Sequence, residues 1–167
     1  MRPSRRRPSF PTLVSAVLLG LVASPASAGL NTWTTGGPPG RPIRDLVVDP
    51  AGGTTAYAGT DTGVYRTTNG GATWTAINGG LTLLDIKALA ISPVPGSLYC
   101  GMNGRGVFKF DGNANWTPFN SGLPVNVAIQ ALATNGSTVV TATSSNIYRS
   151  TDDGLTWNLS TPSNGTT

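Results

Sequence analysis

The sequence predicts an all-β protein built on a repeat of about 41 residues. The four tryptophans, Trp33, Trp74, Trp116 and Trp157, are spaced by 41, 42 and 41 residues. Short runs rich in β-branched and aromatic residues recur with the same period, separated by Gly, Pro, Asn or Asp turns. Beyond the first 28 residues no segment has a sustained 3.6-residue apolar period, so little helix is expected.

Each repeat is predicted to form four short strands. The first three strands are expected at 43–48, 55–60 and 63–67, at 86–91, 97–102 and 106–110, and at 129–134, 138–143 and 146–150. A fourth strand is expected around each tryptophan. Four strands in roughly 40–45 residues is typical of a β-propeller blade. We therefore predict a β-propeller-type fold of about three four-stranded antiparallel blades, approximately 34–77, 78–119 and 120–160.

The repeat count leaves two arrangements open. There are three sets of first-to-third strands but four tryptophan strands, because the strand around Trp33 has no preceding set. Propellers typically have 4–8 blades. The chain is therefore either part of a longer propeller whose C-terminal blades are missing, or it closes by self-association as a homo-oligomer.

Residues 1–28 have the features of a secretory signal peptide. Four arginines within the first seven residues precede an apolar run at 13–23, and an Ala-Ser-Ala site ends at Ala28. The apolar run is shorter than the roughly 20 residues that a membrane span needs. We expect cleavage after Ala28, a mature region of residues 29–167 without a membrane span, and a secreted or periplasmic location.

The basic charge of the chain belongs to this leader. The whole sequence has 11 Lys and Arg against 7 Asp and Glu, and a net charge of +4. Cleavage after Ala28 would remove four arginines and no acid, which leaves a net charge of zero. A basic patch is the usual sign of nucleic-acid binding, so no nucleic-acid partner is expected.

The turn before each of the last three tryptophans carries the most specific motif. Residues 67–74 and 150–157 match Ser/Thr-x-Asp/Asn-x-Gly-x-Thr-Trp, and a shorter copy spans 110–116. We expect these motif residues to stabilise the turns, since short Asp or Asn side chains accept N–H bonds within their own turn. They are Thr67, Asn69, Gly71, Thr73 and Trp74, then Asp111 and Trp116, then Ser150, Asp152, Gly154, Thr156 and Trp157.

With these motifs the chain resembles the Asp-box (BNR) β-propeller families over about residues 30–160. These families include sialidases, sortilin-type receptors, xyloglucan-cleaving glycosidases and photosystem II assembly factors. Sialidases of this fold use an arginine triad, a tyrosine nucleophile with a glutamate partner, and an acidic aspartate. This chain contains no glutamate, so the tyrosine–glutamate pair cannot be built from it.

Composition argues against catalysis. The chain has no histidine, and all seven acids are aspartates. Glycosidases generally need two carboxylates at a defined separation, and no aspartate pair stands out. Cys100 is the only cysteine and lacks a histidine to activate it. Too few acids cluster for a calcium site, so we expect no catalytic residue, metal or cofactor.

A binding surface is the stronger prediction. In an antiparallel blade the second-to-third turns and the connections between blades share one face, and loops on a rigid scaffold often carry recognition. Arg44, Lys87 and Gln130 occupy equivalent positions at the start of the first strands, and Arg105 lies in a loop of this face. We predict an exported binding or scaffold module for a protein or carbohydrate. The alternative is a fragment of a secreted sialidase-like or xyloglucanase-like glycoside hydrolase.

Overall fold

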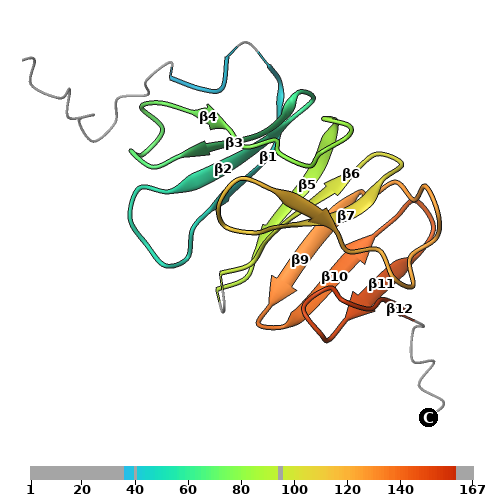
Figure 1. The fold of residues 1–167 in the computed structure, drawn as a ribbon. Helices are drawn as coiled ribbons and strands as arrows, with labels where there is room; N and C mark the ends of the chain where they lie inside the picture. The colour runs from blue at the N-terminus through green and yellow to red at the C-terminus, as the bar shows by residue number, and fades with distance from the viewer. Residues whose placement is uncertain (1–35, 40, 94–95, 161–167) are drawn as a thin grey trace, which may run out of the picture. The chain divides into compact units, whose positions relative to one another are not determined.

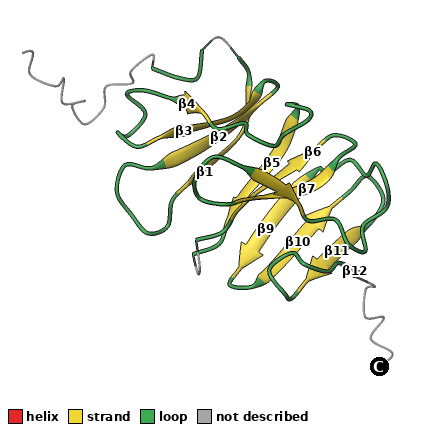
Figure 2. Ribbon diagram, viewed as in Figure 1, coloured by secondary structure: helices red, strands yellow, loops and turns green. Residues whose placement is uncertain are grey.

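The computed structural model describes residues 36–39, 41–93 and 96–160, which form strands joined by turns and loops (Figures 1 and 2). The strands make three four-stranded antiparallel sheets. The first sheet contains β1 (Ile43–Val48), β2 (Ala56–Thr60), β3 (Gly63–Thr67) and β4 (Thr75–Ala76). The second contains β5 (Ile86–Ile91), β6 (Leu98–Met102), β7 (Gly106–Phe110) and β8 (Trp116–Pro118). The third contains β9 (Ala131–Asn135), β10 (Thr138–Ala142), β11 (Ile147–Ser150) and β12 (Asn158–Leu159).

The all-β prediction is confirmed. Strands lie side by side in chain order within each sheet, so each sheet is a simple meander. Neither a helix nor a candidate helical membrane span occurs in the part of the chain that the structure describes. The predicted signal peptide and the predicted strand around Trp33 lie outside the described residues.

The first strand of the third repeat differs from the sequence prediction. It was expected at 129–134, whereas β9 spans Ala131–Asn135. The Ile129 N–H instead donates to the Met102 carbonyl of the second sheet at 3.1 Å. The regular ladder with β10 therefore starts only where Ala131 pairs with Ala142.

The fourth strands differ in their position relative to the tryptophans. They have two or three residues, and of the three described tryptophans only Trp116 lies within its strand. Trp74 and Trp157 end the preceding turns directly before β4 and β12.

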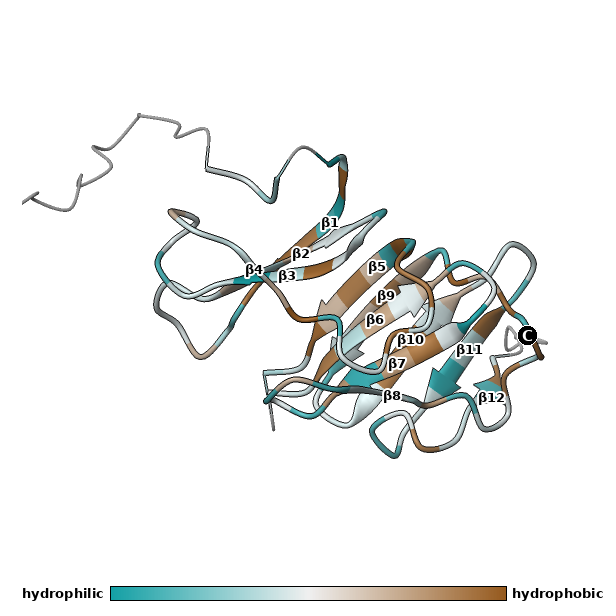
Figure 3. Cartoon of the chain, turned by 45° about the horizontal axis from the view of Figure 1, so that its top comes forward, coloured by the Kyte–Doolittle hydropathy of each residue, from teal (hydrophilic) through white to brown (hydrophobic). Residues whose placement is uncertain are grey.

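Two hydrophobic cores lie between neighbouring sheets. Tyr57 and Val64 of the first sheet pack in one cluster with Ile86, Leu89 and other residues of the second. Tyr99 and Val107 of the second sheet pack with Val139 of the third sheet and with Ile129, which precedes β9. Strands β5 and β7 carry the corresponding hydrophobic segments, coloured brown in Figure 3.

Glycines allow this close approach between sheets. A Cβ on Gly59 would lie 2.7 Å from Ile86 Cγ2, and a Cβ on Gly101 would lie 2.3 Å from Ile129 Cγ2. These distances are shorter than a van der Waals contact. The isoleucine that starts each following repeat therefore packs directly on the backbone of the sheet before it.

The outer face of β1 is exposed. Ile43, Leu46 and Val48 are 50%, 54% and 62% exposed. Their counterparts in the second sheet, Ile86 and Leu89, are 0% and 3% exposed because the first sheet covers them. The first sheet thus presents the surface that the second and third sheets use to pack on a preceding one.

Candidate functional site

Side-chain hydrogen bonds organise the turn between β3 and β4. The Asn69 side-chain oxygen accepts the Thr73 N–H at 2.9 Å and the Thr67 hydroxyl at 3.0 Å. The Thr67 hydroxyl oxygen in turn accepts the Gly71 N–H at 3.0 Å. These motif residues therefore stabilise the local backbone of the turn.

The turn between β11 and β12 repeats this network with a carboxylate. Asp152 accepts the Ser150 hydroxyl at 2.6 Å, the Thr156 N–H at 2.9 Å and the Thr156 hydroxyl at 2.5 Å. The Gly154 N–H donates to Ser150 Oγ at 2.8 Å. Hydrogen bonds from Ser150 first, and then from Thr156, lower the pKa of Asp152 to about 2.

The shorter turn between β7 and β8 reaches the same result with a single side chain. One Asp111 carboxylate oxygen accepts the N–H groups of Asn113, Ala114 and Asn115 at 2.8, 3.0 and 3.0 Å. Hydrogen bonds from the backbone N–H groups of Asn115 and Asn113 are the main causes of the lowered pKa of Asp111. This turn is therefore ordered although it lacks the flanking Ser or Thr.

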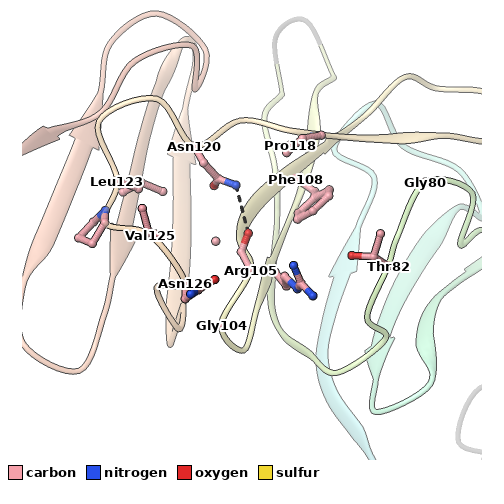
Figure 4. A pocket seen from close by; sticks show the side chains of 12 residues that line it. Gly80, Thr82, Gly104, Arg105, Phe108, Pro118, Asn120, Leu123, Val125 and Asn126 are labelled. Carbon is pink, nitrogen blue, oxygen red and sulfur yellow. Dashed lines mark hydrogen bonds between the residues drawn. The ribbon is translucent and has the colours of Figure 1, made fainter.

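A pocket of about 550 Å³ lies where three loops that join strands meet (Figure 4). The β6–β7 turn and the β4–β5 and β8–β9 connections all contribute to it. It is lined by Gly80, Thr82, Gly104, Arg105, Gly106, Phe108, Pro118, Asn120, Leu123, Pro124, Val125 and Asn126. Arg105, Phe108 and Thr82 lie on one side in Figure 4, and Leu123, Val125 and Asn126 lie on the other.

Asn120 fixes the shape of this pocket. Its amide nitrogen donates to the Arg105 carbonyl at 3.1 Å, and its side-chain oxygen accepts the Val107 N–H at 2.7 Å. The Gly106 N–H also donates to the Val127 carbonyl at 3.0 Å. The turn that carries Arg105 is therefore tied at two points to the opposite wall, which preorganises the pocket.

The lining combines apolar surface with a few polar groups. Phe108 is 6% exposed and forms part of the core, whereas Val125 is 90% exposed. The Arg105 side chain is exposed and supplies the positive charge among these residues. A concave, mostly apolar site with few polar groups is typical of ligand binding.

No family model and no curated protein matches the chain. Solved structures do. YCF48 bound to D1 peptide matches 71% of this chain and 40% of its own, with 17% identity and a TM-score of 0.59. A GH74 xyloglucanase from Xanthomonas campestris matches 74% of this chain and 21% of its own, with 25% identity and a TM-score of 0.57. The WD40 repeats of RRP9 match 71% and 38%, with 12% identity and a TM-score of 0.58.

These neighbours decide the fold class. The chain has a β-propeller fold. Each four-stranded sheet is one blade, and the chain spans less than half the length of each of these neighbours.

Of the four predicted contact residues, one lines the pocket. That residue is Arg105. Arg44 lies at the register shift in the β1–β2 pairing, and Lys87 lies at the register shift in the β5–β6 pairing. Gln130 directly precedes β9. Arg44 and Gln130 are exposed, whereas Lys87 forms a 2.9 Å ion pair with Asp85.

The Cys100 thiol is enclosed in the core. Cys100 is 0% exposed, and burial raises the pKa of its thiol, which keeps it protonated. Within the described residues no three potential ligands come together to hold a metal ion.

Sequence reasoning missed the role of Asn120. The signal was available, because Asn78 and Asn120 stand at the same position after their tryptophans. The Asn78 side-chain oxygen accepts the Val64 N–H at 2.8 Å, just as Asn120 binds Val107. In the first and second blades this side chain thus joins the blade to the connection that leaves it.

Proposed function

We propose that this chain is a non-catalytic propeller module of the Asp-box class that binds a polypeptide segment at the pocket beside Arg105. The observation that carries this proposal is the pocket itself, which combines apolar walls with one guanidinium on a rigid turn. Such a site suits a short segment with an apolar anchor and an acidic or carbonyl group. The guanidinium would fix its orientation through directional hydrogen bonds.

The turn networks support the Asp-box assignment. Asn69 and Asp152 each accept the N–H of the residue four positions later, and Thr67 and Ser150 hydroxyls bridge to them. The polypeptide ligand is supported by one neighbour, because the YCF48 propeller was solved with a bound D1 peptide.

A glycoside hydrolase fragment is the second candidate. Its support is the 25% identity with a GH74 xyloglucanase over 74% of this chain. Glycoside hydrolysis ordinarily requires two carboxylates beside the scissile bond. The residues that line the pocket offer one cation, two amides and one hydroxyl, so this candidate needs carboxylates from elsewhere.

A selection experiment separates the two candidates. The chain without residues 1–28 is panned against a peptide display library and, in parallel, incubated with xyloglucan and sialoside substrates. The binding module selects peptides with a shared apolar and acidic pattern, and those peptides lose affinity for a Val125→Asp variant. Turnover of a glycoside by the purified chain, or peptides that bind the variant equally well, would contradict the proposal.

Export forms part of the same proposal. The four arginines, the apolar run and the Ala-Ser-Ala site before residue 29 support a cleaved leader. N-terminal sequencing of the chain recovered from outside the cytoplasm should begin at Gly29. A chain that stays in the cytoplasm with its first residues intact would contradict this part.

We expect another β-sheet to cover the exposed face of β1. Ile43, Leu46 and Val48 would be buried either by a second copy or by further blades of a longer protein. Light scattering on the mature chain distinguishes these cases. A defined dimer favours self-association. A chain that forms no defined oligomer and aggregates favours coverage by further blades of a longer protein.

A further inference from the structure

Hydrogen bonds from Tyr99 and Lys109 to the Asp153 carboxylate join the second and third blades, and we call this set of three residues the carboxylate lock. Asp153, in the turn between β11 and β12, accepts hydrogen bonds from the Tyr99 hydroxyl and the Lys109 ammonium group of the second blade. The Ser97 hydroxyl lies 3.5 Å from the same carboxylate. Burial alone would raise the pKa of Asp153, but the bonds from Lys109 and Tyr99 outweigh it and lower the pKa.

The first blade repeats the tyrosine and the cation of this lock. Tyr57 and Arg66 are direct partners in the β2–β3 ladder, as Tyr99 and Lys109 are in the β6–β7 ladder. The Arg66 guanidinium carbon lies 5.9 Å from the Tyr57 ring centroid, and the Lys109 nitrogen lies 5.7 Å from that of Tyr99. The two pairs therefore have the same arrangement.

The turn between β7 and β8 has no aspartate at the position equivalent to Asp153. Asp111 and Asp152 are equivalent, because each accepts the N–H of the residue four positions later, at 3.0 and 2.9 Å. The residue after Asp152 is Asp153, whereas the residue after Asp111 is Gly112. A Cβ built on Gly112 meets no heavy atom within 4 Å, so the space for a side chain is open.

Arg66 accordingly has unused hydrogen-bonding capacity. Its Nε is buried and lacks a hydrogen-bond partner among the described residues. Arg66 also lines a hollow of about 200 Å³ together with Thr68, Thr73, Thr75 and Ile77. Thr75 is the direct β-ladder partner of Arg66, so its side chain lies on the same face. A buried donor without a partner is costly, and a ligand that supplies the acceptor would gain that energy.

We propose that the hollow at Arg66, beside the Tyr57 ring, binds an acidic side chain of a partner polypeptide, whose carboxylate takes the place that Asp153 fills in the next junction. The guanidinium offers Nε–H and a terminal N–H in the fork geometry that matches a carboxylate. A polypeptide is the favoured source because the internal example of this lock is an aspartate. This site shares no lining residue with the loop pocket, so it is tested independently of the proposed function.

Acetate is the probe that tests this, since it reproduces the end of an aspartate side chain. Amide resonances of the ¹⁵N-labelled chain around Tyr57, Arg66 and Thr75 should shift and saturate as sodium acetate replaces sodium chloride at constant pH and ionic strength. An Arg66→Met variant should weaken binding by about tenfold or more, because a hydrogen-bonded charge is lost. An Arg149→Met variant, which removes the exposed cation at the equivalent position of the third blade, should not. Equal shifts in both variants, or none in the wild type, would overturn the proposal.

Two further variants keep the test decisive if Arg66→Met does not fold. Gly112→Asp places a carboxylate at the position that Asp153 holds in the next blade, so it should remove the acetate response at Arg66, although the φ of 87° at Gly112 makes any side chain there costly for stability. Asp153→Gly removes the carboxylate between the second and third blades, at a residue whose φ of 62° suits glycine. It should gain an acetate response at Tyr99 and Lys109. A folded Gly112→Asp variant that still responds to acetate as the wild type does would contradict the proposal.

The source of the carboxylate is tested with two larger probes. N-acetyl-aspartate amide should bind the hollow at Arg66 at least as tightly as acetate does. Tighter binding of glucuronate than of the aspartyl probe would overturn the assignment to a polypeptide side chain.

Discussion

The indole N–H of Trp116 donates a 2.6 Å hydrogen bond to the carbonyl oxygen of Ile77, 39 residues earlier in the chain. Trp157 donates in the same way to Phe119 at 2.8 Å. Each acceptor stands three residues after the preceding tryptophan. The 41-residue period in the sequence thus corresponds to a physical link between consecutive blades.

Two replacements of Trp116 should distinguish the contribution of its buried ring to stability from the contribution of its hydrogen bond. Trp116→Ala should lower the free energy of unfolding by about 3–5 kcal/mol, because the side chain is 3% exposed. Trp116→Phe keeps most of the apolar contact and leaves the Ile77 carbonyl without its donor, so it should cost about 1–3 kcal/mol. Urea denaturation measures both. A Trp116→Phe variant as stable as the wild type would show that the hydrogen bond adds nothing, and equal costs for the two variants would show that the ring adds nothing beyond it.

Gly101→Ala should strain the junction of the second and third blades. The new methyl would lie 2.3 Å from Ile129 Cγ2, and overpacking of this kind costs about 1–3 kcal/mol. Gly37→Ala is the matched control, because a Cβ there meets nothing within 4 Å. If Ile129→Ala fails to relieve part of the cost of Gly101→Ala in the double variant, the predicted clash is wrong.

Acid should weaken the turn held by Asp152. Its folded-state pKa of about 2 lies below the ordinary value of 3.8, so its stabilising effect is complete above the ordinary value. That effect is lost as the pH falls from about 3.8 toward 2. Asp152→Asn should remove this part of the pH dependence, and the turn should still form, because Asn69 has the same role in the first blade. Thermal melts across this pH range measure the difference. An unchanged acid profile in the variant would contradict the assignment.

Cys100 should resist thiol reagents until the protein unfolds. The side chain is 0% exposed, and burial raises the pKa of its thiol. We expect no labelling by an aromatic disulfide reagent at neutral pH and complete labelling in denaturant. Rapid stoichiometric labelling of the folded chain would mean that the second blade opens readily.

The first three strands of each of the first two blades could be predicted almost to the residue. Their bounds follow from turn residues and the tryptophan period, both of which are local signals. The start of β9 could not be predicted, because the Ile129 N–H bonds to Met102 of another blade. Local pattern contains no information about such a partner.

The pocket was only partly predictable, for the same reason. Arg105 was identified from its place in a loop on the binding face, but Val125 and Asn126 lie in a connection with no repeat to mark them. The ion pair of Lys109 with Asp153 joins residues 44 positions apart on different blades. Both features depend on how blades pack, which the sequence of one blade does not specify.

The central claim is that the pocket beside Arg105 is the binding site, and calorimetric titration of a selected peptide tests it most directly. The wild type, Arg105→Ala and Arg149→Ala are compared, since both arginines are exposed and only Arg105 lines the pocket. Arg105→Ala should weaken binding by about tenfold or more, because a charged hydrogen-bond donor is removed. Arg149→Ala should bind as the wild type does. Equal affinity in all three chains, or an equal loss in both variants, would contradict the account.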